Sequence, residues 1–372
     1  MGLKPSKDRA RSEAALYSTQ LLRSSEQIRS LSQEAGHLLS GDADALTPEF
    51  FIASTDESAW APRVVRVTRE NSIVGIVYAK ERKFAGIPIG IIYADATLHS
   101  MLAALPADRD AVLQAAFGAL IDSPGTRGLR IVVPETGYER DASLNVLAGR
   151  RLDVCYAKVE NHSALELSPS YDAFLGKLGS TTRRNFRSYR RKFENEGHAY
   201  VEDIPLSEFR NVASALATKC APMSGRKGIE RDLKILSTVS HPMFVGLRQK
   251  NGDWLSILGG WYETDRAVVF LQLNNDRDYR QSSLSIVLRG YLIECLIGRH
   301  VPRVLFWGGA VGTLRPYCQY LPAVCAHLNR PNFSWRALRG LIGWSIAYLP
   351  EDLQRPARWV ASKVSDEHDD AV

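Results

Sequence analysis

A polar loop at residues 274–283 holds the side chains best suited to binding an anion. It follows the apolar segment Ala267–Leu273, which has the pattern of a strand, and precedes a helical pattern from about Ser285 to Ile297. A turn from strand to helix directs free backbone N–H groups to one place, where the helix dipole adds partial positive charge. The loop is therefore a candidate pyrophosphate site, with Arg277, Arg280, Ser283 and Ser285 as the side chains involved. The simpler alternative is that Ser283 only caps the helix.

Two polar side chains lie at the end of the strand that leads into this loop. Gln272 and Asn274 are two residues apart, so a strand directs both to the same side. They are candidates for positioning a reacting group, and the alternative is that they decorate an exposed face. Glycines follow the next short strand, at Gly308 and Gly309, where a backbone or a ligand can approach closely.

A strongly basic helix is predicted in the middle of the chain. Residues 183–192 hold six basic and no acidic side chains. At helical spacing Phe186, Tyr189 and Phe193 form an apolar seam, and the arginines face outward. The basic face is either solvated or a clamp for phosphate or carboxylate groups, since guanidinium binds such groups with two parallel hydrogen bonds. The candidate anion-binding arginines are Arg183, Arg184, Arg187 and Arg191.

The elements that must position these residues occur twice in the same order. Three antiparallel strands, a loop, a helix and a strand are predicted in each copy. In the first copy they are Arg63–Thr68, Ile73–Lys80, Ile87–Tyr93, Asp108–Ile121 and Leu129–Val133. In the second they are Met243–Leu247, Trp254–Tyr262, Ala267–Leu273, Ser285–Ile297 and Val301–Phe306. We therefore predict an α/β (α+β) chain of two tandem units, each a mixed, mainly antiparallel sheet flanked by helices.

The repeat suggests domain boundaries. We expect an N-terminal helical extension at 1–44, a first unit at 45–165 and a second unit at 166–327 that opens with the basic helix at 183–196. Residues 328–372 are expected to form an amphipathic helix and an acidic tail, with 333–349 either packed on the protein or lying at a membrane interface.

Composition excludes a disordered or a collagen-like chain. Hydrophobic residues make up 45% and charged residues 24% of the 372 residues, as in ordinary globular proteins. The net charge of +6 suits an acidic small molecule, and we expect no DNA partner. The five cysteines follow no regular spacing, and Cys318, Cys325 and His327 match no common zinc pattern, so no metal is expected. No signal peptide or membrane span is predicted, which favours a cytoplasmic location, with peripheral contact at the inner face of the membrane left open.

The sequence resembles the double-GNAT acyltransferases, a group that includes CelD-type proteins of polysaccharide biosynthesis and FemAB-like aminoacyltransferases. The resemblance rests on the doubled unit and on the segment Tyr171–Gly197, with its F-L-x-x-L and T-x-R-R-N-x-R-x-x-R-R-K patterns. It covers residues 45–325. In GNAT proteins the turn between the fourth strand and the third helix binds the CoA pyrophosphate, and Arg280–Ser285 occupies that place here, with serine at both glycine positions.

The resemblance implies roles for further residues. The thioester carbonyl of a bound acyl-CoA would lie beside the strand at Phe270–Asn274, including the backbone of Leu273, and the loop would add Gln281 and Ser282. Gln272 and Asn274 would position the acceptor, and Tyr317 would protonate the thiolate that leaves. Trp261 and Trp307 are candidate contacts for the acceptor.

These implications give one expected function and two alternatives. We expect the second unit to bind acetyl-CoA or another acyl-CoA, while the first is degenerate and serves the acceptor. The acceptor would be an amino or hydroxyl group of a small molecule or saccharide, such as a cell-envelope polysaccharide precursor. The alternatives are a FemAB-like aminoacyltransferase that uses aminoacyl-tRNA and a non-catalytic binding or scaffold protein of a polysaccharide system. The oligomeric state is left open.

Overall fold

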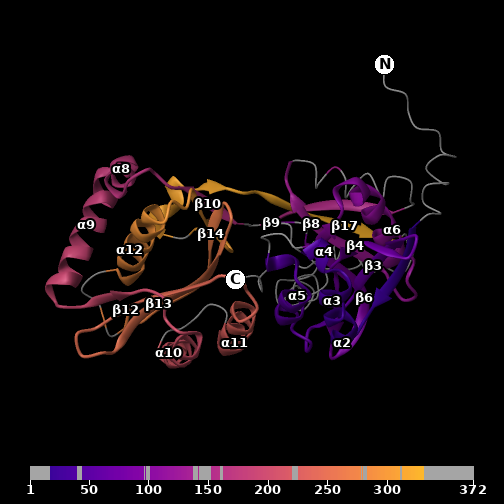
Figure 1. Cartoon of the computed structure of the whole chain (residues 1–372), viewed down its shortest axis with the longest axis horizontal. Coiled ribbons are helices and arrows are strands. Elements are labelled where there is room, and N and C mark those ends of the chain that lie inside the picture. Colours follow the sequence, from indigo (N-terminus) through magenta and orange to yellow (C-terminus); the bar gives the residue numbers. More distant parts are fainter. Residues whose placement is uncertain are drawn as a thin grey trace, which may run out of the picture. The chain divides into compact units, whose positions relative to one another are not determined.

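The protein divides into two compact units. The computed structural model describes residues 17–39, 44–95, 97, 101–136, 141, 152–159, 162–219, 225–277, 279, 283–310 and 312–330. The first unit comprises residues 1–38, 57–159 and 323–372, and the second comprises 39–56 and 160–322 (Figure 1). The predicted 333–349 segment lies outside the described residues. No described helix is long and apolar enough to cross a membrane.

The first unit contains two sheets. The four-stranded sheet has the order β1 (Tyr17–Leu22), β3 (Val64–Arg69), β4 (Ser72–Val77) and β7 (Leu102–Ala104). The six-stranded sheet has the order β2 (Trp60–Pro62), β5 (Lys80–Phe84), β6 (Ile87–Asp95), β8 (Gly128–Pro134), β17 (Ala323–Asn329) and β9 (Asp153–Val159). Its helices are α2 (Ser25–Arg29), α3 (Leu31–Glu34), α6 (Arg109–Asp122) and the short 3-10 turn η3 (Pro106–Asp108), and α4 (Gly36–Leu39) ends at the unit boundary.

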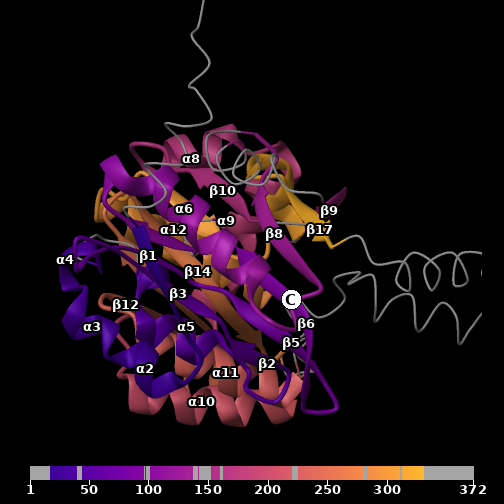
Figure 2. The same ribbon diagram turned by 90° about the vertical axis from the view of Figure 1, so that its right-hand side faces the viewer.

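The second unit is built on one seven-stranded sheet. Its order is β11 (Ala199–Val201), β12 (Pro242–Arg248), β13 (Trp254–Glu263), β14 (Arg266–Asn274), β15 (Arg303–Phe306), β10 (Ser163–Glu166) and β16 (Gln319–Tyr320). The helices are η1 (Asp44–Leu46), α5 (Pro48–Ser54), α8 (Tyr171–Lys177), α9 (Ser180–Asn195), α10 (Leu206–Lys219), α11 (Gly225–Leu236), α12 (Leu284–Gly298) and η4 (Gly312–Tyr317). Helices α9 and α12 lie on one side of β12–β14, and α10 and α11 on the other (Figures 1 and 2).

The basic helix docks by the apolar seam that the sequence predicts. Phe186 and Phe193 on α9 are 2% and 0% exposed and belong to the core that also holds the apolar face of α12. Gly290 lets the two helices approach closely, because a Cβ there would lie 3.3 Å from the Phe186 ring. Burial of these two rings therefore fixes α9 against α12.

The observed unit boundaries differ from the expected ones. Residues 17–22 form strand β1, paired with β3, and so belong to a sheet of the first unit rather than to a helical extension. Helix α5 belongs to the second unit, whereas β17 returns from the second half of the chain to pair with both β8 and β9 of the first. Both neighbours of β17 in the sheet are far away from it in sequence. A local sequence pattern therefore cannot identify them as its partners.

One predicted strand is divided. The segment Ile73–Lys80 was expected to be continuous, but β4 ends at Val77 and β5 begins at Lys80, and the two lie in different sheets. Tyr78 and Ala79 between them are 2% and 1% exposed, so the change of sheet happens inside the core. An apolar run that is buried on all sides carries no periodic signal of such a break. The other predicted strands and helices of the repeat are confirmed within a few residues.

We predict that Phe193→Ala destabilises the second unit by about 3 to 5 kcal/mol, because truncating a fully buried aromatic ring loses its burial energy and leaves a cavity. Chemical denaturation monitored by circular dichroism would measure the change. Ser188→Ala, an exposed position on the same helix, is the matched control and should change stability by less than about 0.5 kcal/mol. Equal stability of the two variants would contradict docking of α9 through Phe193.

Candidate functional site

Strands β14 and β15 run parallel but pair over a short distance only. The paired residues are Ala267–Val269 on β14 and Val304–Phe306 on β15. The Trp307 N–H donates the last hydrogen bond of this ladder to the Val269 carbonyl, at 2.9 Å. Strand β14 then continues to Asn274, whereas β15 ends at Phe306. Beyond Val269, β14 therefore has no register partner on β15.

Aromatic rings occupy the point where the strands part. Phe270 and Trp307 are the first residues beyond the last pair, and their ring centroids are 5.6 Å apart. Trp261 supports both rings, at 5.5 Å from Phe270 and 5.7 Å from Trp307. Phe50 on α5 packs on Trp261 from the other side, at 5.8 Å. We call Phe50, Trp261, Phe270 and Trp307 the aromatic wedge, because these four rings pack together where the pairing of β14 with β15 ends.

A bulge in β14 directs Phe270 into the aromatic wedge. Gly259 of β13 pairs with Leu271 and Gly260 pairs with Val269, so Phe270 is an extra residue without a register partner. Only glycine fits at Gly260, because a Cβ there would lie 1.8 Å from the Val268 carbonyl oxygen. The bulge also shifts, by one residue, the alternation of β14 side chains between the two faces of the sheet. Gln272 and Asn274 therefore lie on the face that α12 covers.

The turn after β15 leads the chain away from β14. The Gly309 N–H donates to the Phe306 carbonyl at 3.0 Å, and Gly308 has a φ of 78°, which a turn of this kind requires at its third residue. The Gly308 N–H donates to Nδ1 of His162 at 3.0 Å, and the His162 ring lies 4.8 Å from that of Trp307. Burial lowers the pKa of His162 to about 4, and the positive charge of Arg266 adds to this shift. His162 is therefore neutral at pH 7 and accepts the Gly308 hydrogen bond.

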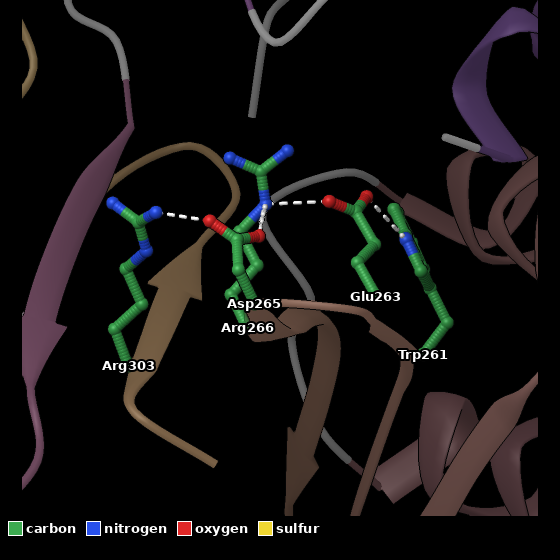
Figure 3. A network of polar contacts seen from close by, with 5 residues as sticks. All are labelled: Trp261, Glu263, Asp265, Arg266 and Arg303. Carbon is green, nitrogen blue, oxygen red and sulfur yellow. Dashed lines mark hydrogen bonds and ion pairs between the residues drawn. The ribbon is translucent and has the colours of Figure 1, made fainter. Parts of the chain in front are cut away.

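An ionic network holds the other end of the parallel pair together (Figure 3). The Trp261 Nε1–H donates to Glu263 at 3.0 Å, and Glu263 pairs with Arg266 at 2.5 Å. Asp265, in the turn between β13 and β14, pairs with Arg303 at the start of β15. The half-exposed Asp265–Arg303 pair contributes at most about 1 kcal/mol. Glu263 is nearly buried, so losing one of its partners would cost several times more, at about 3 to 5 kcal/mol.

Gln272 and Asn274 lie together in a polar cluster. The Gln272 amide donates to Oδ1 of Asn274 at 3.1 Å, and the Ser256 hydroxyl donates to the same oxygen at 2.5 Å. Arg289 on α12 donates from Nε to Oε1 of Gln272 at 3.0 Å, which fixes the orientation of that amide. Ser256 also donates to the carbonyl of Leu273, whose side chain is buried. The two polar residues at the end of β14 are thus held in place from both neighbouring elements.

The N-cap residue of α12 does not cap the helix with its own side chain. Ser283 is the N-cap residue, and its side chain makes no capping hydrogen bond. Ser283 and Ser285 are both partly exposed. Arg280, Gln281 and Ser282 lie outside the described residues. An uncapped start of a 15-residue helix fits an anion such as a pyrophosphate, because its free N–H groups and its dipole both favour negative charge.

Contacts with α9 hold the loop before α12. Tyr279 is 4% exposed, and its hydroxyl donates to Glu196 at 2.8 Å. Glu196 also pairs with His198 at 3.1 Å, and Nδ1 of His198 accepts a hydrogen bond from the backbone of Lys250. The end of the basic helix therefore positions the loop that leads into α12.

Tyr317 lies at the start of the same basic helix. Its hydroxyl oxygen accepts from the Gly179 N–H at 2.8 Å. Hydrogen bonds from the Thr182 side chain and from Gly179 lower the pKa of Tyr317. The neighbouring Cys318 lies near Arg289: burial raises the pKa of this thiol to about 11, and the guanidinium charge offsets part of the rise. Arg289, which fixes the orientation of Gln272, therefore also lies near the segment that carries Tyr317.

The arginines of α9 divide into two sets. Arg190 turns inward, where it pairs with Glu194 and Glu294 and lies 4.2 Å over the Tyr291 ring. Arg187 makes a loose contact of 3.7 Å with Asp172. Within the described part of the chain Arg183, Arg184 and Arg191 form no ion pair, and Arg184 and Arg191 are exposed. The outward set is thus available to an anionic ligand.

The two candidate tryptophans have different environments. Trp261 is completely buried in the aromatic wedge, so packing rather than direct contact with a ligand explains its position. Trp307 is partly exposed at the point where β14 and β15 part. No cluster of three or more metal-ligating side chains occurs among the described residues.

The first unit differs from the second at both corresponding places. Its parallel strands β6 and β8 pair up to Asp95, the last residue of β6, so they do not part. Asp108 directly precedes α6, and its buried carboxylate bonds Tyr17 and Arg69. A negative charge already occupies the start of this helix, which excludes a phosphate there. The candidate site is therefore in the second unit.

Sequence reasoning missed Arg289 and His162. Arg289 was recognisable as the one charged residue in the middle of the apolar segment Leu284–Tyr291, where a buried charge needs a reason. His162 carries no such signal, because its partners Trp307 and Gly308 are far away in sequence.

Comparison with known proteins shows the fold. No protein-family profile matches the sequence, and no curated protein matches it. L-PGS from Bacillus licheniformis is 11% identical over 84% of this chain and 93% of that chain, with a TM-score of 0.52. FemX is 10% identical over 81% and 98%, with a TM-score of 0.52. The C-terminal domain of a putative lysylphosphatidylglycerol synthetase from Agrobacterium fabrum is 12% identical over 87% and 97%, with a TM-score of 0.51. The chain has the double-GNAT fold that the sequence resemblance implied.

We predict that His162 makes the protein less stable in acid. Its pKa is about 4 in the folded protein and near 6.5 in the unfolded chain, so between these values the unfolded chain binds a proton that the folded protein does not. The contribution of His162 to the free energy of unfolding is complete above pH 6.5 and decreases as the pH falls toward 4. Below pH 4 it stays constant, after a total loss of about 3 kcal/mol.

Denaturation curves between pH 7 and 4 would measure this effect. His162→Gln keeps an acceptor for the Gly308 N–H but does not titrate, so its stability should depend less on pH. His241→Gln, at an exposed histidine, is the control and should keep the wild-type dependence. The same pH slope in His162→Gln and wild type would refute the assignment.

Proposed function

We propose that the protein is a GNAT-type acyltransferase that uses acyl-CoA, with acetyl-CoA as the first donor to test. The acceptor would be an amino or hydroxyl group of a polar molecule such as a sugar or a cell-envelope polysaccharide precursor. One observation carries the proposal: in the second unit β14 extends past its pairing with β15, and the Ser283 side chain does not cap the helix α12 that follows. In the first unit β6 stays paired to its end and Asp108 places a negative charge at the start of α6, so we assign the donor to the second unit.

The described residues fit a bound acyl-CoA without a metal. The start of α12 and its Ser283 would hold the pyrophosphate, and the backbone of Phe270–Asn274, beyond the end of the parallel pairing, would hydrogen-bond the acyl group. CoA supplies the activated thioester. Gln272 and Asn274, fixed by Arg289 and Ser256, would orient the acceptor beside it.

Tyr317 is suited to protonate the sulfur that leaves. Its oxygen already accepts hydrogen bonds from Gly179 and Thr182, so its own O–H is available to donate elsewhere. The same hydrogen bonds lower its pKa toward that of a thiol, which improves proton transfer. Glu263 is not a candidate base, because Arg266 and Trp261 both bind its carboxylate.

A cytoplasmic location agrees with the proposed donor. The described cysteines Cys155, Cys295, Cys318 and Cys325 form no disulfide, as in proteins of reducing compartments.

A second candidate donor is aminoacyl-tRNA. The outward arginines Arg183, Arg184 and Arg191 favour it, because a row of unpaired guanidinium groups suits a phosphate backbone. FemX has a similar fold, and the FemAB-like group that the sequence resembles is the source of this alternative. The two donors differ in the salt dependence of binding, which is steep only for the nucleic acid.

We predict that Ser283→Asp weakens acetyl-CoA binding at least tenfold, because it places at α12 the charge that Asp108 places at α6. Asp is a good N-cap residue, so the fold should not suffer. Ser283→Asn has the same shape without the charge and should bind within about threefold of wild type. Isothermal calorimetry measures both. No binding of any acyl-CoA at millimolar concentration by the wild type would reject this donor and favour the aminoacyl-tRNA alternative.

We predict that Tyr317→Phe lowers kcat about 100-fold or more and leaves KM for acetyl-CoA nearly unchanged, because the hydroxyl acts on the leaving sulfur and not on the bound donor. Release of free CoA thiol in the presence of a panel of amino sugars would measure the rate. The wild-type rate should fall at alkaline pH with a midpoint below the usual pKa of tyrosine.

Tyr320→Phe, at an exposed tyrosine three residues away, is the control and should retain the wild-type rate. A Tyr317→Phe enzyme with full kcat would assign proton transfer to water or to another group.

A further inference from the structure

The hairpin formed by β5 and β6 ends in an exposed apolar tip. Residues Phe84–Pro88 have the sequence FAGIP, and all five are exposed. Phe84 is 63% exposed and Ile87 is 68% exposed, the highest values for large hydrophobic side chains in the described part of the chain. The tip carries no charge and no polar side chain. Exposure of this much contiguous apolar surface needs an explanation.

The hairpin holds this tip in a defined geometry beyond the six-stranded sheet. Strand β8 pairs with β6 only from Ile91 onward, and the β2–β5 register runs from Lys80 to Arg82. Ala85 and Gly86 both have positive φ values, 49° and 80°, as in the tight two-residue turn that matches strand twist. Phe84 pairs with Ile87 across the hairpin, so both side chains lie on one face. Figure 2 shows the hairpin near the β5 and β6 labels.

Cations surround the base of the tip. Lys80, Arg82 and Lys83 all lie on β5, and Lys80 and Arg82 both lie over the Trp60 ring, at 4.6 and 4.9 Å from its centroid. The only acidic residue of this strand, Glu81, is 7% exposed and is paired with Arg63.

Arg82 and Lys83 form no ion pair among the described residues. Lys83 donates to the backbone carbonyl of Glu57 at 2.7 Å, while the Glu57 carboxylate accepts from Ser25. Both Arg82 and Lys83 therefore keep an uncompensated positive charge beside the tip.

We propose that this hairpin docks the protein on an anionic lipid bilayer. The apolar tip would enter the interfacial layer, the partly exposed Trp60 would lie at headgroup depth, and Arg82 and Lys83 would contact lipid phosphates. The charge pattern favours lipid over a protein groove, because Arg82 and Lys83 directly precede the tip and form no ion pair among the described residues. One hairpin tip with two basic residues gives reversible binding rather than a permanent anchor. The proposal does not depend on the acyl donor or acceptor.

Vesicle sedimentation with the full chain tests the proposal. We expect binding to phosphatidylcholine vesicles that contain phosphatidylglycerol, and at least tenfold weaker binding to phosphatidylcholine alone. Phe84→Ser/Ile87→Ser should lose at least tenfold in apparent affinity for the anionic vesicles, with unchanged circular dichroism because both side chains are exposed. The matched control is Val154→Ser/Tyr156→Ser, which removes two exposed apolar side chains from edge strand β9 of the same unit and should bind like wild type.

Three outcomes would overturn the proposal. The first is no binding of the wild type to anionic vesicles at millimolar lipid. The second is an equal loss in the two double variants, which would indicate nonspecific adsorption. The third is a dimer in gel filtration that Phe84→Ser/Ile87→Ser converts to monomer without any vesicle binding, which would assign the tip to contact between copies of the chain. Arg82→Gln/Lys83→Gln separates the charge contribution and should reduce binding severalfold only when phosphatidylglycerol is present.

Discussion

The short parallel pairing of β14 with β15 is the constraint on which the candidate site depends. Asp265 and Arg303 link the two strands where they begin, and the aromatic wedge separates them after Val269 and Phe306. The turn after Phe306 has Gly308 at its third residue, where the positive φ favours glycine, and the Gly308 N–H donates to His162. This turn leads the chain away from β14. The rest of β14 therefore extends past its partner and delivers Gln272 and Asn274 beside the start of α12. Packed aromatic rings, rather than a catalytic group, occupy the point where the pairing ends.

The two units show what the same repeat becomes with and without this constraint. In the first unit β6 and β8 remain paired to the end of β6, and Asp108 supplies negative charge at the start of α6. In the second unit the strands part and α12 starts with an uncapped serine. The two copies of the repeat therefore differ: one unit keeps a closed sheet, and the other has the parted strands to which we assign the proposed acyl donor. Strand β17 comes from the second half of the chain but pairs with β8 and β9 of the first unit.

Positive charge is used in three different ways. On α9, Arg190 is a structural residue that bridges Glu194, Glu294 and the Tyr291 ring, whereas Arg183, Arg184 and Arg191 face outward. Inside the second unit, Arg289 is nearly buried and orients Gln272. On β5 of the first unit, basic side chains surround an apolar tip. The small net charge of +6 hides this arrangement, because it averages separate basic surfaces with acidic ones.

The sequence by itself determined the repeat, most strand and helix positions, the docking seam of α9 and the polar residues at the end of β14. These follow from hydrophobic periodicity and turn residues, which act over a few neighbouring positions. The tertiary structure decided the rest. It divided Ile73–Lys80 between two sheets, returned β17 to the first unit, buried Trp261, turned Arg190 inward and brought His162 to Gly308. Each of these depends on contacts between residues distant in sequence, and such contacts form only when the strands have taken their order in the sheet.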